Sequence, residues 1–362
     1  MYINFFQNRL TQSPKCILNY TKSDSINKIL VSVVIPIHNQ ASILYGNLRS
    51  LFECISLDCE IILIDDSSSD HSVEEVLRAI KADVPDTVQS LTFYSFKYPI
   101  YESACDDFAI RKAKGEYIIE LQADMKIMEQ AFDSKMLKVL HEYTDIFMLS
   151  GRGVMNFEEI TNIYRNSRGT ESSMSKSVLR SIFRNLVQLF NVRSKLKSKE
   201  EIALEEYTDG EFTSELIFPK SEQFVKTGRA GRLGRLIEVL PKSESENIYI
   251  GETVMRGPIC FQTKRYIDLG GLNLNSFFLG YDEHDLNLRA RIEKGWKAAF
   301  MYIAFSSPLM HGSMRKKRSL ISKFELYLAT KRINRSQSNV LSNYEELRCS
   351  FISSYEVRKV LK

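Results

Sequence analysis

The segment Ile61–Asp70, with the sequence IILIDDSSSD, limits the folds open to this chain more than any other stretch. Four apolar residues run directly into two adjacent carboxylates and a serine cluster. Such a run is typical of a buried parallel strand, so Asp65 and Asp66 fall where the strand ends. Open parallel sheets bind ligands beyond the carboxyl ends of their strands. A serine or Asp70 is enough to cap the next helix, so the acid pair indicates a ligand site.

A second apolar run, residues 30–37, lies upstream and leads through Pro36, His38 and Asn39 into an amphipathic helix predicted over residues 41–57. The order of strand, polar turn, helix, strand and acidic turn predicts a right-handed βαβ unit with both strand ends on one edge. Neither strand is followed by a glycine-rich phosphate loop, which argues against a dinucleotide fold or a P-loop. The phosphates of a nucleotide would then need a divalent cation held by carboxylates.

A third predicted strand, residues 116–121, brings another acidic turn to the same edge of the sheet. It follows a helix predicted over residues 103–114, for which Gly115 suits a C-terminal cap. The strand delivers three residues to this edge, Gln122, Ala123 and Asp124. Capping alone does not readily explain a third acidic strand end.

A second acidic cluster lies near the C-terminal part of the chain. Asp282, Glu283 and Asp285 open a predicted helix that ends at Gly295. The helix dipole favours acids in a first turn, but three acids in four positions exceed that need. We expect Asp285 to cap the helix and Glu283 to face a substrate.

The composition is that of a globular protein that works in a reducing compartment. Of 362 residues, 44% are hydrophobic and 26% are charged, and six cysteines lack any metal-binding spacing. The net charge of +4 is too small to imply nucleic acid as a partner. With no signal peptide and no apolar run of membrane-spanning length, we expect a cytoplasmic protein.

Lysines and arginines gather in residues 176–199 and again in residues 315–318. In the first segment apolar residues recur at helical spacing. A helix packed on the core with a solvated basic face explains this pattern, and docking on an anionic membrane surface is the alternative. The alternative predicts peripheral, salt-sensitive association with the inner face of a membrane.

Five segments, taken in order, carry a family resemblance. They are VSVVIPIHNQ, IILIDDSSSD, ACDDFAIRKAKGEYIIELQADM, GPICFQTKRYIDLGGLN with FLGYDEHDLNLRARIEKGW, and PLMHGS. Together they resemble family 2 of the inverting nucleotide-sugar glycosyltransferases, over residues 30–150 and 250–312. The resemblance implies the GT-A fold, which is α/β with a Rossmann-like, mostly parallel central sheet flanked by helices, here with a helical insertion and a C-terminal helical extension.

The resemblance also implies a division of the chain into five parts. These are an N-terminal extension (1–28), the nucleotide-sugar-binding half of the GT-A domain (29–151), a basic, partly helical insertion (152–250), the acceptor and catalytic half (251–312) and a C-terminal helical extension (313–362).

Carried over residue by residue, the resemblance implies a nucleotide site at the first strand ends. Asp66 would accept a hydrogen bond from a uracil-type imide, and Pro36 and Asn39 would line the base pocket. The remaining nucleotide-binding positions are Asp65, Gln122 and Ala123.

The implied metal site departs from the family's pattern. Asp124 matches the second acid of the D-x-D motif and would ligate Mn²⁺ or Mg²⁺ on the diphosphate, with His311 as a ligand or diphosphate contact. Gln122 replaces the first acid. Its carbonyl can still ligate a hard cation, or hold the ribose, with less charge.

The implied reaction is a single inverting displacement, with Glu283 and Asp282 as the base and Asp285 beside them. The donor is a nucleotide diphosphate sugar, expected to be a UDP-sugar, and the acceptor is a hydroxyl of a glycan or lipid-linked molecule of the cell envelope. A base takes the proton of the hydroxyl while a cation stabilises the departing diphosphate.

Two other readings stay open. A sugar-1-phosphate nucleotidylyltransferase needs a glycine-rich basic loop after the first strand, which residues 38–42 do not supply. A catalytically silent GT-A-like scaffold is the second alternative. Gln122 favours the scaffold, whereas the intact acids of residues 282–285 and His311 disfavour it.

Overall fold

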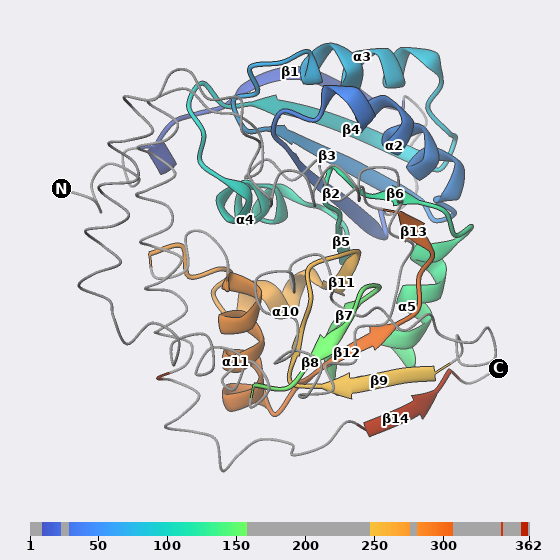
Figure 1. The fold of residues 1–362 in the computed structure, drawn as a ribbon, viewed down its shortest axis with the longest axis vertical. Coiled ribbons are helices and arrows are strands. Elements are labelled where there is room, and N and C mark those ends of the chain that lie inside the picture. Colours follow the sequence, from blue (N-terminus) through green and yellow to red (C-terminus); the bar gives the residue numbers. More distant parts are fainter. Residues whose placement is uncertain are drawn as a thin grey trace, which may run out of the picture.

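The computed structural model describes residues 9–22, 29–157, 247–275, 281–306, 342 and 356–360. A ten-stranded sheet forms the centre of this part of the chain (Figure 1). In spatial order its strands are β1 (Lys15–Thr21), β4 (Val88–Ser95), β3 (Cys59–Asp65), β2 (Val31–Ile37), β5 (Tyr117–Glu120), β11 (Ile259–Gln262), β7 (Ile146–Ser150), β12 (Lys297–Met301), β9 (Asn247–Gly251) and β14 (Glu356–Lys359). Two small ribbons pair β8 (Val154–Met155) with β10 (Thr253–Val254) and β6 (Lys126–Ile127) with β13 (Phe305–Ser306).

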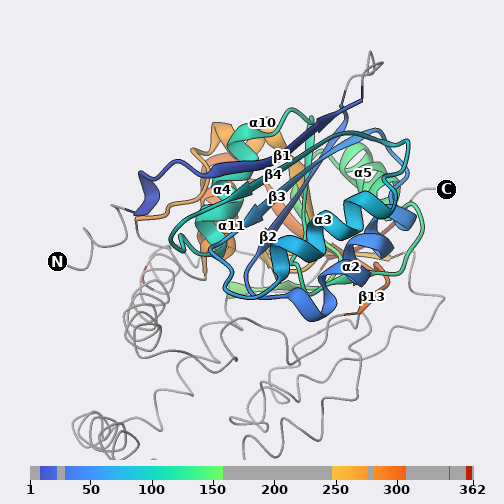
Figure 2. The same cartoon turned by 90° about the horizontal axis from the view of Figure 1, so that it is seen from above.

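Helices cover both faces of the sheet, as Figure 2 shows for α2 and α3 against α4 and α11. One face carries α2 (Ala41–Cys54), α3 (Ser72–Ala82) and α5 (Phe132–Glu142), and the other carries α4 (Glu102–Lys112), α10 (Thr263–Asp268) and α11 (Asp282–Lys294). Successive residues of a strand point to opposite faces. Val33 and Ile35 therefore enter the core under α2, while Val34 enters the core under α4.

The four neighbouring strands β4, β3, β2 and β5 are parallel, which confirms the predicted α/β class. β2 pairs in parallel with both β3 and β5, and β3 pairs in parallel with β4. β2 and β3 are buried along their whole length, as strands covered on both faces must be, and this explains their continuous apolar sequences. β11 is antiparallel to β5 and to β7, and so joins the second half of the sheet to the first.

The edges of the sheet contain two strands that the sequence patterns did not indicate. β1 lies within the N-terminal extension expected over residues 1–28 and pairs antiparallel with β4. Most of its residues are exposed, so it lacks the apolar alternation that would have identified it. β14 lies within the expected C-terminal helical extension, and Arg358 anchors it by donating to both carboxylate oxygens of Asp145 at 2.7 and 2.8 Å.

The role expected for Gly115 is wrong, because α4 ends at Lys112 and its C-cap is Ala113. Gly115 instead sits against β2, where an added Cβ would lie 2.5 Å from the Ser32 nitrogen and 2.5 Å from its Oγ. A glycine is therefore needed at position 115 because the backbone there lies directly against the backbone of β2.

Several predictions fall outside the described residues. They are the basic helix within residues 176–199, the basic segment 315–318 and the position of His311. Among the described residues, no helix is long and apolar enough to cross a membrane. Peripheral association with a membrane therefore stays a prediction.

Asp133 in the first turn of α5 ties that helix to the loop before β3. Its carboxylate is fully buried and accepts hydrogen bonds from the Ser56 and Leu57 nitrogens at 2.9 and 2.7 Å, and from the Ser56 hydroxyl at 2.8 Å. We expect Asp133→Ala to lower the free energy of unfolding by about 2–4 kcal/mol, because two partly buried backbone N–H groups and the Ser56 hydroxyl lose their buried carboxylate partner. Urea unfolding measures this, with the exposed Glu53→Ala on α2 as control. A change under about 0.5 kcal/mol would refute the assignment.

Candidate active site

The acidic turn after β3 is closed by its own hydrogen bonds. Asp65 accepts from the Ser68 nitrogen at 3.0 Å and from the Ser95 hydroxyl at 2.7 Å. Asp66 accepts from the Ile100 and Tyr101 nitrogens at 2.6 and 3.0 Å. Burial raises the pKa of Asp66 to about 6, while these backbone donors lower it. Asp66 therefore holds the loop in which α4 begins.

The turn after β2 is joined to the same structure. The Asn39 nitrogen donates to the Ser68 hydroxyl at 3.0 Å, and the Asn39 side-chain oxygen accepts from the Ser69 nitrogen at 2.8 Å. His38 Nδ1 lies 2.7 Å from the Asp66 carbonyl oxygen. Pro36 is buried in β2 opposite Ile64 of β3. The structure thus brings these sequence-predicted residues of the two strand ends together, as the βαβ pattern predicts.

The turn after β5 carries Gln122, Ala123 and Asp124. The Ala123 carbonyl accepts from Asn47 Nδ2 of α2 at 2.9 Å, and the Gln122 carbonyl accepts from the Met125 nitrogen at 3.0 Å. The Gln122 side-chain amide donates to Glu102 Oε1 at 2.8 Å. Asp124 is partly buried in this turn.

The start of α11 places Asp282 and Glu283 in different environments. The Asp282 side chain is fully buried, whereas that of Glu283 is 15% exposed. Glu283 Oε2 has no hydrogen-bond partner among the described residues, and Oε1 lies 4.0 Å from His284 Nε2. His284 Nδ1 is in turn 2.8 Å from the Thr253 hydroxyl. Asp282 Oδ1 also has no hydrogen-bond partner among the described residues, but Asp282 is paired with Arg256, so Glu283 is the more exposed of the two acids and the one that no arginine binds.

Asp285 does not cap α11, and that prediction is wrong. The N-cap is Tyr281, with φ of 66° and no side-chain cap hydrogen bond. Asp285 instead pairs with Arg289 one turn later, with 2.9 Å between Oδ2 and Nε. Arg289 also donates to the Leu269 and Gly271 carbonyls at 2.6 and 2.8 Å. This attractive partner on the same helix face explains why Asp285 turns away from the helix start.

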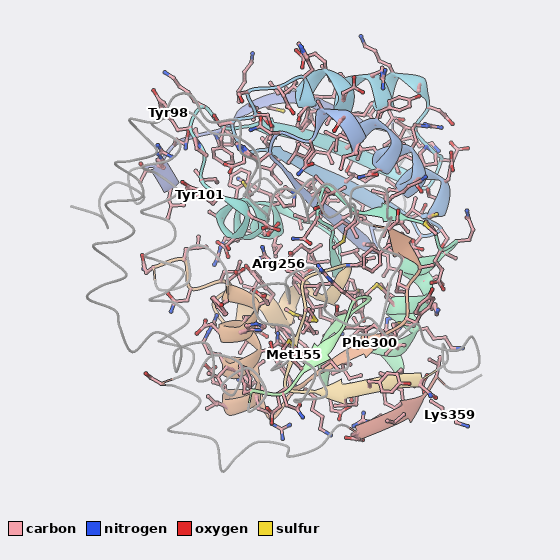
Figure 3. The ribbon with its side chains drawn as sticks, viewed as in Figure 1. Tyr98, Tyr101, Met155, Arg256, Phe300 and Lys359 are labelled. Atoms are coloured by element: carbon pink, nitrogen blue, oxygen red, sulfur yellow. The ribbon has the colours of Figure 1, made fainter. Side chains whose placement is uncertain are left out.

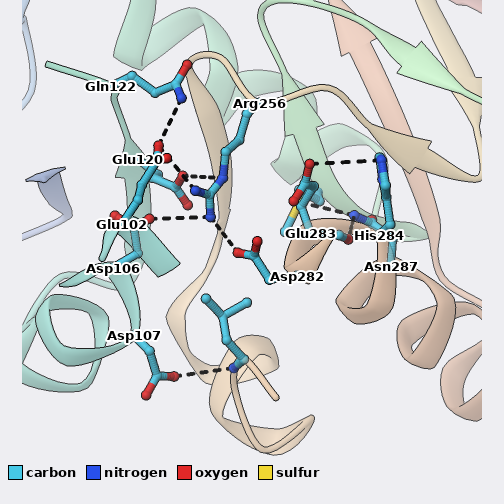
Figure 4. Close-up of polar contacts among 12 residues, drawn as sticks. Glu102, Asp106, Asp107, Glu120, Gln122, Arg256, Asp282, Glu283, His284 and Asn287 are labelled. Carbon is cyan, nitrogen blue, oxygen red and sulfur yellow. Dashed lines mark hydrogen bonds and ion pairs between the residues drawn. The ribbon is translucent and has the colours of Figure 1, made fainter. Parts of the chain in front are cut away.

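Arg256 lies between the two halves of the site and is surrounded by carboxylates (Figures 3 and 4). Its Nη1 lies 3.2 Å from Glu102 Oε1, and its Nη2 lies 3.4 Å from Asp106 Oδ2. Its Nε lies 3.4 Å from Glu120 Oε1, and Nη2 also donates to Asp282 Oδ2. Two of these acids come from α4, one from β5 and one from α11. One cation therefore serves four acids from three elements.

The buried carboxylates of this cluster resist ionisation. Burial raises the pKa of Asp282 and of Glu120 to about 7, and raises that of Asp106 well above its usual range. The Arg256 charge opposes the rise in all three. Near neutral pH, the acids of the cluster are therefore partly protonated, and the remaining negative charge is balanced by one guanidinium.

The sequence analysis missed Arg256 and its partners in α4 and β5. Their separations along the chain leave no short motif, since Arg256 and Glu102 are over 150 positions apart. Two signals were present: Glu120 is an acid inside the apolar strand YIIEL, and Arg256 is a cation inside the apolar run VMRGPICF. A buried charge requires a partner of opposite charge. Glu120 and Arg256 therefore each indicated that such a partner lies nearby in the fold.

The described residues supply a single acid of the expected metal motif. Asp124 is that acid, and no group of three or more His, Cys, Asp or Glu side chains in the described part of the chain is placed to hold a metal ion. His311 lies outside that part. A divalent cation here fits only if it takes most of its ligands from a bound substrate, as Mg²⁺ sites commonly do.

A family model matches the region that contains the turns after β2, β3 and β5. Residues 32–193 match the family described as Glycosyl transferase family 2. Together with the parallel strand order, this match assigns the matched region to a glycosyltransferase with the GT-A fold. Among curated proteins, none matches the chain.

Solved structures with a similar fold are distant in sequence. The mannosyltransferase PcManGT from Pyrobaculum calidifontis, in complex with GDP-Man and Mn²⁺, is 13% identical over 96% of this chain and 82% of that chain, with a TM-score of 0.45. S. aureus TarS in complex with UDP is 12% identical over 89% and 72%, with a TM-score of 0.42. GalNAc-T7 with UDP, GalNAc and Mn²⁺ is 14% identical over 76% and 43%, with a TM-score of 0.44. Nothing about donor, metal or acceptor follows from likenesses this remote.

Glu120 gives a prediction for stability against pH. Its pKa is raised from 4.5 to about 7 in the folded state, so the native protein binds more protons than the unfolded chain between these values. The free energy of unfolding therefore falls as pH rises through this window, by up to about 3 kcal/mol. We expect Glu120→Gln to abolish this part of the pH dependence, since the amide cannot titrate.

Urea unfolding at pH 5 and pH 8 measures the change in both proteins. Glu53→Gln on the exposed face of α2 is the control, and it should keep the wild-type dependence. Equal losses of stability in wild type and Glu120→Gln between the two pH values would contradict the prediction.

Proposed function

We propose that this protein is an inverting glycosyltransferase. It transfers a sugar from a nucleotide diphosphate donor, with a UDP-sugar as first candidate, to a hydroxyl of a glycan or lipid-linked acceptor. The observation that carries the proposal is Glu283, whose Oε2 has no hydrogen-bond partner among the described residues at the start of α11. Asp282 beside it is buried and paired with Arg256. The pair thus separates a partly exposed carboxylate that no arginine binds from a buried one anchored by Arg256.

Glu283 is assigned as the general base. In a single displacement, the acceptor oxygen forms a bond to the anomeric carbon as the bond to the diphosphate oxygen breaks. The acceptor proton passes to Glu283 Oε2, and the nucleotide diphosphate leaves. A positioned base of this kind contributes about 10²–10⁴-fold to the rate. No covalent intermediate is required.

The closed turns after β2 and β3 support a base-binding role for Asp66. Its carboxylate has about four acceptor positions. Two of them take backbone hydrogen bonds. We assign a remaining position to the imide N–H of a uracil. Because the carboxylate is held by fixed backbone groups, it is oriented before the ligand arrives.

The diphosphate also needs a counter-charge. We assign Asp124 and His311 as protein ligands of Mn²⁺ or Mg²⁺, which would neutralise the departing diphosphate when bound. Gln122 and Ala123 lie in the same turn as Asp124 and are assigned to the nucleotide. With one carboxylate in this turn, the site relies on the diphosphate oxygens to complete the metal shell.

The first test concerns the base. Glu283→Gln should lower kcat by about 10²–10⁴-fold and leave donor affinity unchanged, because the amide keeps the shape but cannot take a proton. Hydrolysis and transfer are measured with a panel of UDP- and GDP-sugars, and UDP affinity by calorimetry. Glu293→Gln is the matched control, since Glu293 is exposed on the same helix.

The outcome distinguishes the two acids. If Asp282→Asn reduces kcat more than Glu283→Gln while both variants stay folded, the base is assigned to the wrong residue. If the wild-type protein hydrolyses no member of the panel but binds UDP, the scaffold alternative is favoured.

The second test concerns the metal. We expect Mn²⁺ alone to bind weakly and to bind at least tenfold more tightly in the presence of UDP, because the diphosphate supplies the missing ligands. Asp124→Asn should abolish this gain, whereas Asp268→Asn on the exposed face of α10 should keep it. Calorimetry measures both affinities. Full hydrolysis of the donor in excess EDTA would contradict the assignment.

A further inference from the structure

The backbone around Arg256 is fixed on both sides. The Arg256 carbonyl accepts from Arg152 Nη1 at 2.9 Å, and the carbonyl of the preceding Met255 accepts from the Ser150 hydroxyl at 2.9 Å. A Cβ added to Gly257 would lie 2.5 Å from the Arg152 Cβ, so the next residue is packed too tightly for a side chain. The backbone of residue 256 is therefore held in place, and the position of the guanidinium depends on the side-chain torsions of Arg256.

The geometry of the cluster suits the guanidinium of an arginine better than the ammonium of a lysine. Arg256 faces Glu102 and Asp106 of α4, Glu120 of β5 and Asp282 of α11 with three different nitrogens. A guanidinium presents five donors in a rigid plane, whereas a lysine ammonium is a compact point charge. The Arg256 side chain is 13% exposed, so water screens these contacts little.

The start of α11 depends on this contact. The helix begins without a side-chain cap, and its N-cap residue Tyr281 has a positive φ of 66°. Asp282 is the first residue of the helix, and its buried carboxylate is bound to Arg256. Glu283 follows it directly, so the orientation of the first turn determines where Glu283 points.

Arg256 also reaches the donor side through Glu102. Asp66 fixes the nitrogen of Tyr101 at 3.0 Å, and the next residue, Glu102, pairs with Arg256 at 3.2 Å. Gln122 binds the same Glu102 oxygen at 2.8 Å. The guanidinium is thus the link between the turns after β3 and β5 and the helix that carries the base (Figure 4).

We propose that Arg256 is a positioning residue for the transfer reaction: it ties Asp282, and with it Glu283, to α4 and β5. This inference rests on the proposed function, because it takes Glu283 as the base. Arg256 does not touch the reacting atoms in this assignment. It acts by holding the first turn of α11 in register with the donor-side turns and by opposing the rise in the pKa of Asp282 that burial causes.

The test compares charge and geometry separately. Arg256→Lys keeps the charge but loses the planar donors, and should lower kcat about tenfold or more with the acid limb of the pH profile unmoved. Arg256→Met removes the charge, and is made together with Asp106→Asn so that fewer buried acids are left unpaired. Compared with Asp106→Asn alone, the double variant should move the acid limb of kcat to higher pH by about one unit.

A second readout needs no turnover. The Asp282 carboxyl is followed by ¹³C NMR in aspartate-labelled protein, and its signal is assigned by its loss in Asp282→Asn. Glu102, Asp106, Glu120 and Glu283 are the acids that face or adjoin it, so Asp106→Asn again serves as the reference. The midpoint of the Asp282 titration should rise by about one unit or more in the double variant and stay in place in Arg256→Lys.

Arg358→Met is the control for loss of a structural arginine. Arg358 has a similar exposure of 16% and also pairs with two acids, Asp145 and Glu356, but at the far edge of the sheet. Its loss should lower stability without moving the kcat profile or the Asp282 titration.

The outcomes separate this inference from the proposed function. If the wild type turns over a sugar nucleotide but Asp282 titrates identically in Asp106→Asn and in the double variant, the role of Arg256 is refuted. Unchanged kcat in a folded Arg256→Lys protein would also refute it. If the wild type turns over no member of the donor panel, the proposed function fails, whatever the Asp282 titration shows.

Discussion

Parallel pairing of β2 with both β3 and β5 is the constraint on which the rest of the structure depends. Parallel neighbours end on one edge of a sheet, so their three following turns must meet there. The turns after β2 and β3 are closed by short polar side chains: Asn39 bonds to Ser68 and Ser69, and Asp66 bonds to the loop before α4. The site is rigid because its own polar groups bind one another.

The second half of the sheet adds a cation to the acidic groups at this edge. β11 runs antiparallel between β5 and β7, and the segment before it carries Arg256 into the middle of the molecule. Without a cation there, Asp106, Glu120 and Asp282 would be buried with no counter-charge, which is strongly unfavourable, and the partly exposed Glu102 would add a further like charge. The guanidinium therefore makes it possible for α4, β5 and α11 to approach one another with acids on their facing sides.

The order of strands and helices around the candidate site could be predicted from the sequence, because local apolar runs and polar turns encode it. The placement of Asp65, Asp66 and Asn39 followed from the same patterns. The edge strands were not predictable in this way, since β1 is largely exposed and has no apolar alternation. The Arg256 cluster was not predictable either. Its partners come from distant segments, and only the isolated charges at positions 120 and 256 indicated that something must neutralise them.

The same electrostatics explain why a glutamine stands where the D-x-D motif has its first acid. Gln122 donates its amide to Glu102 at 2.8 Å, and Glu102 is also bound to Arg256. A carboxylate at position 122 would have no proton to donate and would face Glu102 with like charge, in a cluster that already holds four acids around one cation. An amide removes that repulsion and supplies a donor. The glutamine at position 122 therefore fits the surroundings that Arg256 creates, and in the proposed metal site it leaves Asp124 and the substrate to hold the cation.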